Sequence, residues 1–568
     1  MARTLVPRTI RTAFMVCALS GAVHTALAQV SPSPAPAAAP AEDRCAALAN
    51  GHLELAELKS ATHLAAGSAV AGTGSSMPAG PGAGKPISGL PGFCRVIGSI
   101  HAEPGSDIHF EVWLPTDWNG RLKGAGNGGF AGSIAYGDLA AAVRAGQIGV
   151  STDTGHSAAN AIQIDGSWAK GHPERLRDYG WRAIHLSTVA AKQLARDYYG
   201  RSPDFAYFAS CSNGGRQALM EATRFPEDYD GIMAGAPAAE FTDLILSMIW
   251  TAQVQEPPGA AMHMEQSQLL QQEVLAQCDA LDGQTDGLIS DPQRCKFDPS
   301  KLACGISNSP QCFTPPQLDA LRKIYAGPHD AAGRRVAPAF GPGGAEGADP
   351  SIYLGWGTWI MGGEGKSSGS QFARAFLQDL VDKPFTDIAH FDFNKDPARL
   401  KAAVSGDLDV QPDVHRFFDR GGKLILWHGW GDAAIPPQAT LDLHEAILRK
   451  SGPKARHQMR LFMVPGLQHC FAGNGPTDFG QVGVPLASDS PERNISAALQ
   501  AWVEKGRVPD SVVGLRGGPL PAGLGLMIPG LDKAPSTKPT ERLICAYPAK
   551  AALTIGSDPD KASSYRCK

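Results

Sequence analysis

The sequence predicts an α/β fold, in which a mostly parallel β-sheet is covered by helices and interrupted by a long insertion. Residues 43–238 and 409–568 alternate short β-compatible runs with helical runs, an arrangement typical of parallel strands joined by helices. Residues 239–408 lack this alternation, contain Gly/Pro-rich segments and hold four cysteines. We therefore expect the two outer stretches to form one α/β core, with residues 239–408 inserted as a lid.

The elements of the core can be placed in chain order. In the first outer stretch, β-like runs are expected at Ile108–Leu114, Gln147–Thr152 and Phe205–Ala209, and helices at Trp181–Tyr199 and Gly215–Arg224. In the second, strands are expected at Lys423–Trp427 and Arg460–Val464, and helices at Gln438–Arg449 and Ile495–Glu504. Strand ends in such a core are where functional side chains gather.

The N-terminus is organised like a secretory signal peptide. Three arginines precede the apolar run 13–23, and Ala-Leu-Ala at 26–28 supplies a cleavage pattern. We expect residues 1–28 to be a signal peptide and the Pro/Ala-rich residues 29–42 to be an extended linker. Since no other apolar run approaches the roughly 20 residues that cross a bilayer, the sequence predicts a secreted or periplasmic protein without a membrane span.

The charge and the cysteine content of the chain limit which binding partners, disulfides and metals are expected. The chain has 51 Lys and Arg against 55 Asp and Glu, without a long charged run, so it lacks the electrostatic signature of a nucleic-acid or membrane-surface protein. Removal of Cys17 with the signal peptide leaves ten cysteines, which in an exported protein indicates five disulfides. Neither CxxC nor HExxH occurs, which disfavours zinc. The oligomeric state is left open.

Ser212 is the candidate nucleophile. The β-compatible run Phe205–Ala209 leads into Ser-Cys-Ser-Asn-Gly-Gly-Arg and then into a helical stretch. A strand, a sharp turn and a helix form a nucleophile elbow, which needs small residues two positions before and after the nucleophile; here these are Ser210 and Gly214. The alternative is an ordinary serine at a helix N-cap.

Asp432 and His469 are the candidate orienter and general base. Each follows a predicted strand, and the chain order Ser212, Asp432, His469 is that of α/β hydrolases. Taken singly, each could be a turn or surface residue. His156 is a competing base and Asp153 a competing acid, but both precede the nucleophile, so a structural role is expected for them.

Two cysteines adjoin these residues: Cys211 precedes Ser212 and Cys470 follows His469. A disulfide between them would hold the nucleophile and the base within side-chain reach, because it brings the two Cβ atoms to about 3.8 Å. An oxyanion hole is expected from two backbone N–H groups. Asn213 follows the nucleophile, and the glycine-rich loop 123–132 offers Gly129.

An Asp-rich segment lies in the predicted lid. Four aspartates fall within residues 279–291, between Cys278 and Cys295, with glycines that permit tight turns. Clusters of hard oxygen ligands suit Ca²⁺. The spacing is not that of an EF-hand, and the alternative is an acidic, solvated turn.

Together these motifs resemble the tannase/feruloyl esterase family. The resemblance rests on Cys211-Ser212, Asp432, His469-Cys470, the run Gly231–Pro237, the Asp-rich loop and Gly421–Leu426. It implies an α/β hydrolase with a cap inserted in the core, structural Ca²⁺ in that cap, and esters of aromatic carboxylic acids as substrates. The implied roles are Ser212 nucleophile, His469 base, Asp432 orienter, and Gly129 and Asn213 oxyanion donors.

The resemblance also implies ligands and disulfides. Calcium would be held by the side chains of Asp279, Asp282 and Asp286 and by the carbonyls of Gln284 and Leu288. Substrate would contact Trp359 and Ile435. The disulfides would be Cys45–Cys94, Cys211–Cys470, Cys278–Cys295, Cys304–Cys312 and Cys545–Cys567.

For the substrate, the resemblance ranks a feruloyl-esterase-like serine esterase with an acyl-enzyme intermediate first. A mono-(2-hydroxyethyl) terephthalate hydrolase or a tannase is the alternative. One family member grips the free terephthalate carboxylate with Arg, Phe and Ser of its cap, whereas here Lys366–Phe372 lacks that set and has Ser367 at the expected arginine. A different class is an inactive, calcium-stabilised binding protein, which the complete Ser, Asp and His set argues against.

Overall fold

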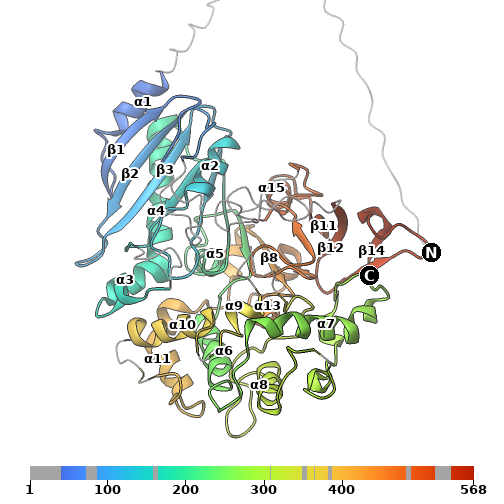
Figure 1. Ribbon diagram of the computed structural model, residues 1–568. Helices are drawn as coiled ribbons and strands as arrows, with labels where there is room; N and C mark the ends of the chain where they lie inside the picture. Colours follow the sequence, from blue (N-terminus) through green and yellow to red (C-terminus); the bar gives the residue numbers. More distant parts are fainter. Residues whose placement is uncertain are drawn as a thin grey trace, which may run out of the picture. The chain divides into compact units, whose positions relative to one another are not determined.

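A nine-stranded β-sheet forms the centre of the fold, in the order β1-β2-β3-β5-β4-β6-β7-β8-β9 (Figure 1). From β5 to β9 every neighbouring pair is parallel, which confirms the predicted α/β class. The predicted strand at Ile108–Leu114 is present as β3, and β1 and β2, which pair antiparallel beside it, widen the sheet beyond the prediction. The strands are β1 Glu57–Leu64, β2 Phe93–Ile100, β3 Ile108–Pro115, β4 Arg121–Gly124, β5 Ile148–Thr152, β6 Phe205–Cys211, β7 Gly231–Gly235, β8 Lys423–Gly429 and β9 Met459–Val464.

The computed structural model describes residues 40–71, 86–157, 164–307, 309–347, 355–363, 365–381, 385, 387–481, 488–517 and 539–568. The predicted signal peptide and almost all of the predicted linker lie outside these residues. Residues 41–568 form one compact unit, which begins with α1, Ala41–Leu48. In the described part of the chain, we find no helix with the length and apolar character needed to span a membrane.

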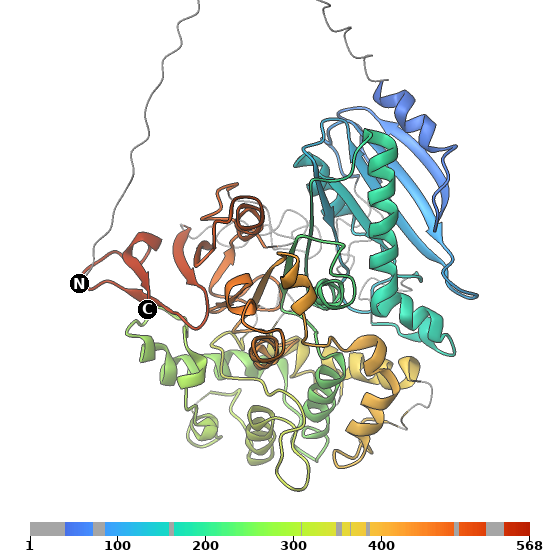
Figure 2. The ribbon, with the colours of Figure 1, turned by 180° about the vertical axis from the view of Figure 1, so that it is seen from behind.

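Alternating side chains divide the parallel strands between two hydrophobic clusters. Phe208 and Leu424 belong to one cluster with residues of α4, α5 and α13, whereas Tyr207 and Ile425 belong to another with residues of α15. Neighbouring residues of a strand point to opposite faces, so helices cover both faces of the sheet, as Figure 2 shows for α4. The core helices are α2 Tyr136–Arg144, α3 Pro173–Arg177, α4 Ala183–Tyr199, α5 Asn213–Arg224, α12 His415–Asp419, α13 Pro437–Lys450, α14 Ala455–Gln458 and α15 Ile495–Lys505.

Between β7 and α12 the chain forms helices and irregular segments, with only isolated bridges among its described residues. These helices gather beyond one end of the sheet (Figure 1). One of their hydrophobic clusters also includes Phe130, Tyr179 and Ile435 from segments of the core, so the insertion packs directly on the core. The helices are α6 Phe241–Gln253, α7 Ser267–Cys278, α8 Pro315–Ala326, α9 Trp356–Trp359, α10 Ser368–Ala375 and α11 Asp396–Leu408.

The C-terminal part adds two small antiparallel sheets that the sequence reasoning did not foresee. They comprise β10 Pro476–Asp478, β11 Ser511–Arg516 and β12 Thr540–Cys545, and β13 Ala551–Leu553 with β14 Tyr565–Cys567. Five disulfides are present, in the pairs that the family resemblance implies: Cys45–Cys94, Cys211–Cys470, Cys278–Cys295, Cys304–Cys312 and Cys545–Cys567.

Candidate active site

Ser212 occupies the one-residue turn between β6 and α5. Its φ of 66° and ψ of −128° lie where a residue with a side chain is strained. A Cβ atom on Gly214 would come within 2.0 Å of Ser210 Oγ, so the position two residues after Ser212 requires glycine. The strand, strained turn and helix have the geometry of a nucleophile elbow.

A chain of hydrogen bonds joins Ser212, His469 and Asp432. His469 Nε2 lies 2.9 Å from Ser212 Oγ, and His469 Nδ1 lies 2.7 Å from Asp432 Oδ2. Because an ionised carboxylate only accepts, Nδ1–H donates to Asp432 and the serine hydroxyl donates to Nε2. The arrangement can therefore pass the serine proton to the imidazole.

The Asp432 carboxylate is almost completely buried and fully partnered. Its Oδ1 accepts the backbone N–H groups of Ala434 and Ile435, at 2.8 and 2.9 Å. Its Oδ2 faces His469 and also His428, whose Nε2 lies 3.1 Å away. Burial by itself raises the pKa of Asp432, but His469 and His428 outweigh burial and hold that pKa well below its usual range. The carboxylate thus stays ionised beside the imidazole.

His428 is a site residue that the sequence reasoning missed. It lies near the end of β8 with no exposed side-chain surface, and its Nδ1 is 2.7 Å from Thr440 Oγ1. The available signal was the spacing His428-Gly-Trp-Gly-Asp432, which follows a predicted strand. A lone histidine ending a strand is hard to distinguish from a core residue without that geometry.

The disulfide Cys211–Cys470 connects the two neighbours of Ser212 and His469, with Cα atoms 6.0 Å apart. Cys470 has a φ of 65°, so the base loop turns sharply immediately after His469. The bond joins the end of β6 to the loop after β9 across 259 residues of sequence. It therefore limits how far the base can move from the serine.

The glycine-rich loop after β4 packs on the start of α5. A Cβ on Gly126 would lie 2.8 Å from Gly214 Cα, so the two backbones meet closely. Asn127 N–H donates to Gln217 Oε1 at 2.9 Å, and Asn213 Nδ2 donates to Asn127 O at 3.4 Å. Gly129 lies further along the same loop with a φ of 51°. The loop is thus held beside the elbow by both close packing and hydrogen bonds.

His156 and Asp153 lie in structural settings. The His156 ring stacks on Trp168 with centroids 3.7 Å apart, and its Nε2 is 2.7 Å from Phe130 O. Burial lowers the pKa of His156 to about 4. Asp153 accepts the backbone N–H groups of His109 and Gly155. The imidazole that contacts Ser212 is that of His469.

Aromatic side chains from the insertion lie over the site. The Trp359 ring stands edge-on to His469 with centroids 6.2 Å apart, and its buried indole N–H has no hydrogen-bond partner among the described residues. Phe372 of α10 stacks on Phe130 at 4.2 Å. Ser367 is buried and accepts the Ser370 N–H as the N-cap of α10, so its hydroxyl is engaged in capping the start of that helix.

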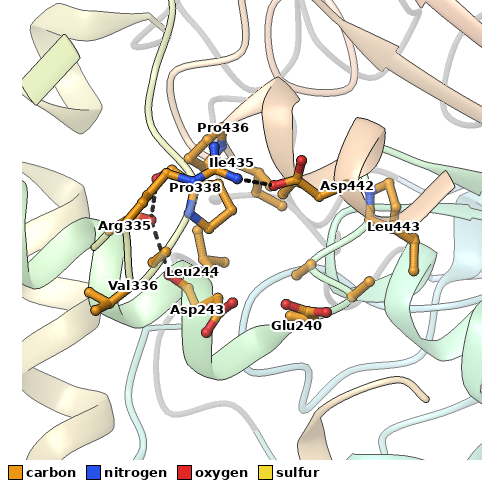
Figure 3. A pocket seen from close by; sticks show the side chains of 16 residues that line it. Glu240, Asp243, Leu244, Arg335, Val336, Pro338, Ile435, Pro436, Asp442 and Leu443 are labelled. Carbon is orange, nitrogen blue, oxygen red and sulfur yellow. Dashed lines mark hydrogen bonds and ion pairs between the residues drawn. The ribbon is translucent and has the colours of Figure 1, made fainter. Parts of the chain in front are cut away.

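Ile435 is only 2% exposed and acts here chiefly through its backbone, which holds Asp432. Its side chain lines a cavity of about 130 Å³ between α6 and α13 (Figure 3). Arg335 and Asp442 pair at 2.8 Å on one side of this cavity, and the Glu240 and Asp243 carboxylates lie on the other. Ser212, Asp432 and His469 do not line it, so it is separate from the serine.

The three aspartates expected to bind calcium share one pattern. Each uses one carboxylate oxygen to accept a backbone N–H of the loop, from Gly287, Gln284 and Leu288 respectively. The second oxygens of Asp279 and Asp282 are buried without a hydrogen-bond partner among the described residues, and that of Asp286 contacts Arg542. Burial is the main cause that raises the pKa of Asp286 to about 6, and repulsion from the carboxylates of Asp282 and Asp279 adds to it. This set of hard oxygens fits a divalent cation such as Ca²⁺.

Another cluster of possible metal ligands comes from α4, α5 and the segment after α5. Of the described residues, one set of three or more His, Cys, Asp or Glu side chains brings all its ligand atoms within 4.8 Å, namely His185, Glu221 and Asp228. The Asp-rich loop is therefore more widely spread than this set. His185 and Lys192 already pair with Asp228, at 2.5 and 3.6 Å, so we assign it no calcium.

A family model described as Tannase and feruloyl esterase matches residues 94–568. The chain belongs to the tannase and feruloyl esterase family. Membership indicates a carboxylic ester hydrolase.

Relatives from the tannase family support the family assignment through both sequence identity and fold similarity. A probable feruloyl esterase B-2 of Aspergillus flavus is 33% identical over 75% of this chain and 80% of its own length. The mono(2-hydroxyethyl) terephthalate hydrolase of Piscinibacter sakaiensis is 31% identical over 84% and 85%. The crystal structure of feruloyl esterase B from Aspergillus oryzae matches with a TM-score of 0.78 and 26% identity, covering 93% of this chain and 100% of the other. The expected α/β-hydrolase fold is thereby confirmed for this tannase-family chain.

Proposed function

We propose that this chain is an exported serine esterase that hydrolyses esters of aromatic carboxylic acids through an acyl-enzyme intermediate. The observation that supports it most is the hydrogen-bonded chain Ser212–His469–Asp432 at a strained elbow. The named relatives support the aromatic acid: one is a probable feruloyl esterase and another a terephthalate monoester hydrolase.

Acylation begins when Ser212 Oγ attacks the ester carbonyl carbon while His469 Nε2 takes the hydroxyl proton. The carbonyl electron pair moves onto its oxygen, and Asp432 stabilises the imidazolium. When the tetrahedral intermediate collapses, the bond to the alcohol oxygen breaks and His469 returns the proton to that oxygen. A water molecule then repeats the sequence on the acyl-enzyme and releases the aromatic acid and free Ser212.

The oxyanion formed in both steps needs donors that are already in place. We assign this role to the backbone N–H groups of Asn213 and Gly129. Asn213 is the first residue of α5, where N–H groups have no partner within the helix. The loop that carries Gly129 is held against this helix through Asn127.

The aromatic acid is best accommodated beside Trp359, close to His469. A flat ring can pack on this indole, and the unpartnered indole N–H offers a donor to a substrate oxygen. The position at which the family resemblance places an arginine is Ser367 here, and its hydroxyl caps the start of α10. This position therefore offers no guanidinium to a free carboxylate. We therefore place feruloyl-type esters ahead of terephthalate monoesters and gallate esters.

Calcium has a structural role in this proposal. Asp279, Asp282 and Asp286, with the carbonyls of Gln284 and Leu288, would hold Ca²⁺ in the lid, and the cation would offset the mutual repulsion of the carboxylates. No step of ester cleavage uses it.

The test is a comparison of kcat/KM for methyl ferulate, methyl gallate and mono-(2-hydroxyethyl) terephthalate, with Ser212→Ala as the blank. We expect methyl ferulate to be the best substrate. Preference for the terephthalate monoester would establish the alternative function. If none of the three, nor a chromogenic aryl ester, were hydrolysed above the Ser212→Ala blank, the chain would belong to the inactive binding class.

A further inference from the structure

The two proposed oxyanion donors come from separate segments. Asn213 begins α5, whereas Gly129 lies in the loop after β4. Glycine at a φ of 51° has other backbone conformations open to it, so packing must fix its direction. Catalytic donors are effective only when they already point at the developing charge. The structure contains a continuous set of contacts that links these two residues.

The first part of this link is Arg216, on the first turn of α5. Its side chain is completely buried. Nε donates to Asn213 Oδ1 at 2.9 Å, Nη1 to Gly180 O at 2.7 Å and Nη2 to Tyr179 O at 3.2 Å. Among the described residues, the guanidinium forms no ion pair with a carboxylate. It therefore serves as a rigid, planar fork between α5 and the turn at Tyr179.

The second part is Tyr179, in the π-helical turn Asp178–Arg182 that precedes α4. Its hydroxyl donates to Gly129 O at 3.0 Å. The ring is fully buried and lies under the Arg216 guanidinium, 4.8 Å from its centroid. Burial raises the pKa of Tyr179 to about 12, so the phenol keeps its proton and remains a donor. One residue thus holds Arg216 with its carbonyl and Gly129 with its hydroxyl.

We infer that Arg216 and Tyr179 are positioning residues that fix Gly129 and Asn213 relative to each other as an oxyanion hole. The inference rests on the proposed function, since it concerns the donors of that reaction. The Asn213 side chain is held at both ends, by Arg216 on Oδ1 and by Asn127 on Nδ2. In this proposal neither Arg216 nor Tyr179 contacts substrate. Both act by fixing the positions of the backbone N–H groups of Asn213 and Gly129.

The expected effect is a loss of transition-state stabilisation with little loss of substrate binding. Removing an oxyanion donor outright costs about 100- to 1,000-fold in kcat, and a displacement of about 1 Å costs about a hundredfold. Tyr179→Phe removes one hydroxyl and keeps the ring, so we expect about a tenfold fall in kcat. Arg216→Lys keeps a charge but loses the fork, so about a hundredfold fall is expected.

The experiment measures kcat and KM on an aryl ester and the affinity for an aryl trifluoromethyl ketone, which gives a tetrahedral oxyanion when a serine adds to it. Tyr199→Phe is the matched control, because its hydroxyl also donates to a backbone carbonyl, Pro115 O at 2.6 Å, at the far end of α4. We expect Tyr179→Phe to lower kcat and ketone affinity by similar factors with KM unchanged, and Tyr199→Phe to match the wild type in both.

Unchanged kcat in a folded Tyr179→Phe variant, or a rise in KM without loss of ketone affinity, would overturn the inference. Should Arg216→Lys fail to fold, Tyr179→Phe alone decides. Failure of the proposed function gives a different result: the wild type would neither hydrolyse the ester nor bind the ketone better than Ser212→Ala.

Discussion

The catalytic candidate Asp432 and the aspartates of the Asp-rich loop differ in how completely the chain provides partners for their carboxylate oxygens. Asp432 has partners for both carboxylate oxygens, and its pKa is held low. The Asp-rich loop leaves one carboxylate oxygen of Asp279 and one of Asp282 without a partner among the described residues, and the pKa of Asp286 is raised. A buried carboxylate without partners is costly. The comparison teaches that the chain alone completes the first site, whereas the second leaves carboxylate oxygens that a bound cation would satisfy.

The largest expected effect follows from breaking the completed site. Ser212→Ala and His469→Ala should each reduce kcat by about 10⁴-fold or more, and Asp432→Asn should be similarly severe because it disturbs the His469 tautomer. Steady-state hydrolysis of a chromogenic aryl ester measures this. The control is Ser187→Ala, a buried serine of α4, which should retain wild-type turnover. Near-normal turnover in folded Ser212→Ala would refute the assignment.

The second expected effect distinguishes the disulfide Cys211–Cys470, beside the candidate active site, from a disulfide far from it. Cys211→Ala/Cys470→Ala frees the elbow and the base loop, and a displacement of about 1 Å costs about a hundredfold in rate. We expect a loss of kcat of that size in the folded variant, measured below its unfolding temperature. Cys545→Ala/Cys567→Ala, which removes the link between β12 and β14, should lose stability but little kcat. Equal losses of activity in both variants would contradict this account.

The lid loop is expected to respond to calcium where the catalytic site does not. Chelation should lower the Tm by about 5 °C and added Ca²⁺ restore it, because a ligand that binds only the folded state stabilises that state. Activity well below the Tm should hardly change. Asp282→Asn should abolish most of the calcium response, while Asp319→Asn, an exposed aspartate paired with Lys323, should keep it. A metal-free protein that melts at the calcium-loaded temperature would reduce the loop to an acidic turn.

The pH dependence of this calcium response has a defined sign. In the metal-free fold the pKa of Asp286 is about 6, above the ordinary 3.8. The folded state therefore holds this proton more tightly than the unfolded state, and the resulting stability is lost as pH rises from about 4 to 6. Calcium must displace that proton. We expect a small calcium-induced rise in Tm at pH 5 and a larger rise at pH 7.5, and Asp286→Asn should remove the difference.

The smallest effect concerns His156, whose pKa is lowered to about 4. Below about pH 6.5 the His156 side chain is protonated in the unfolded chain but stays neutral in the folded chain. The free energy of unfolding therefore decreases as the pH falls from about 6.5 to 4. His156→Gln should flatten the fall of Tm over that interval. It should also cost less than about tenfold in kcat, against orders of magnitude for His469→Ala. A larger loss, with the fold intact, would return His156 as the base.

Sequence reasoning found the three residues that the structure joins by hydrogen bonds, because each belongs to a local pattern. Ser212, Asp432 and His469 each follow a strand, and strand-to-loop transitions are visible in one chain. It missed His428, Arg216 and Tyr179, because their roles arise from contacts between distant segments, such as Tyr179 with Gly129. The antiparallel strands β1 and β2 were missed for a similar reason, since their partners are set by the completed sheet. Disulfide pairing came only from the family resemblance, because spacing does not determine connectivity.

The most direct measurement for the central claim is covalent labelling by an aryl phosphonate, followed by peptide mass spectrometry of the unreduced protein. The phosphorus reagent traps an activated serine, so one adduct is expected on the peptide that contains Ser212, still joined to the Cys470 peptide through Cys211. Labelling should be lost in His469→Ala and kept in the calcium-free protein. An adduct on another serine, or no adduct in an enzyme that hydrolyses aryl esters, would contradict the account.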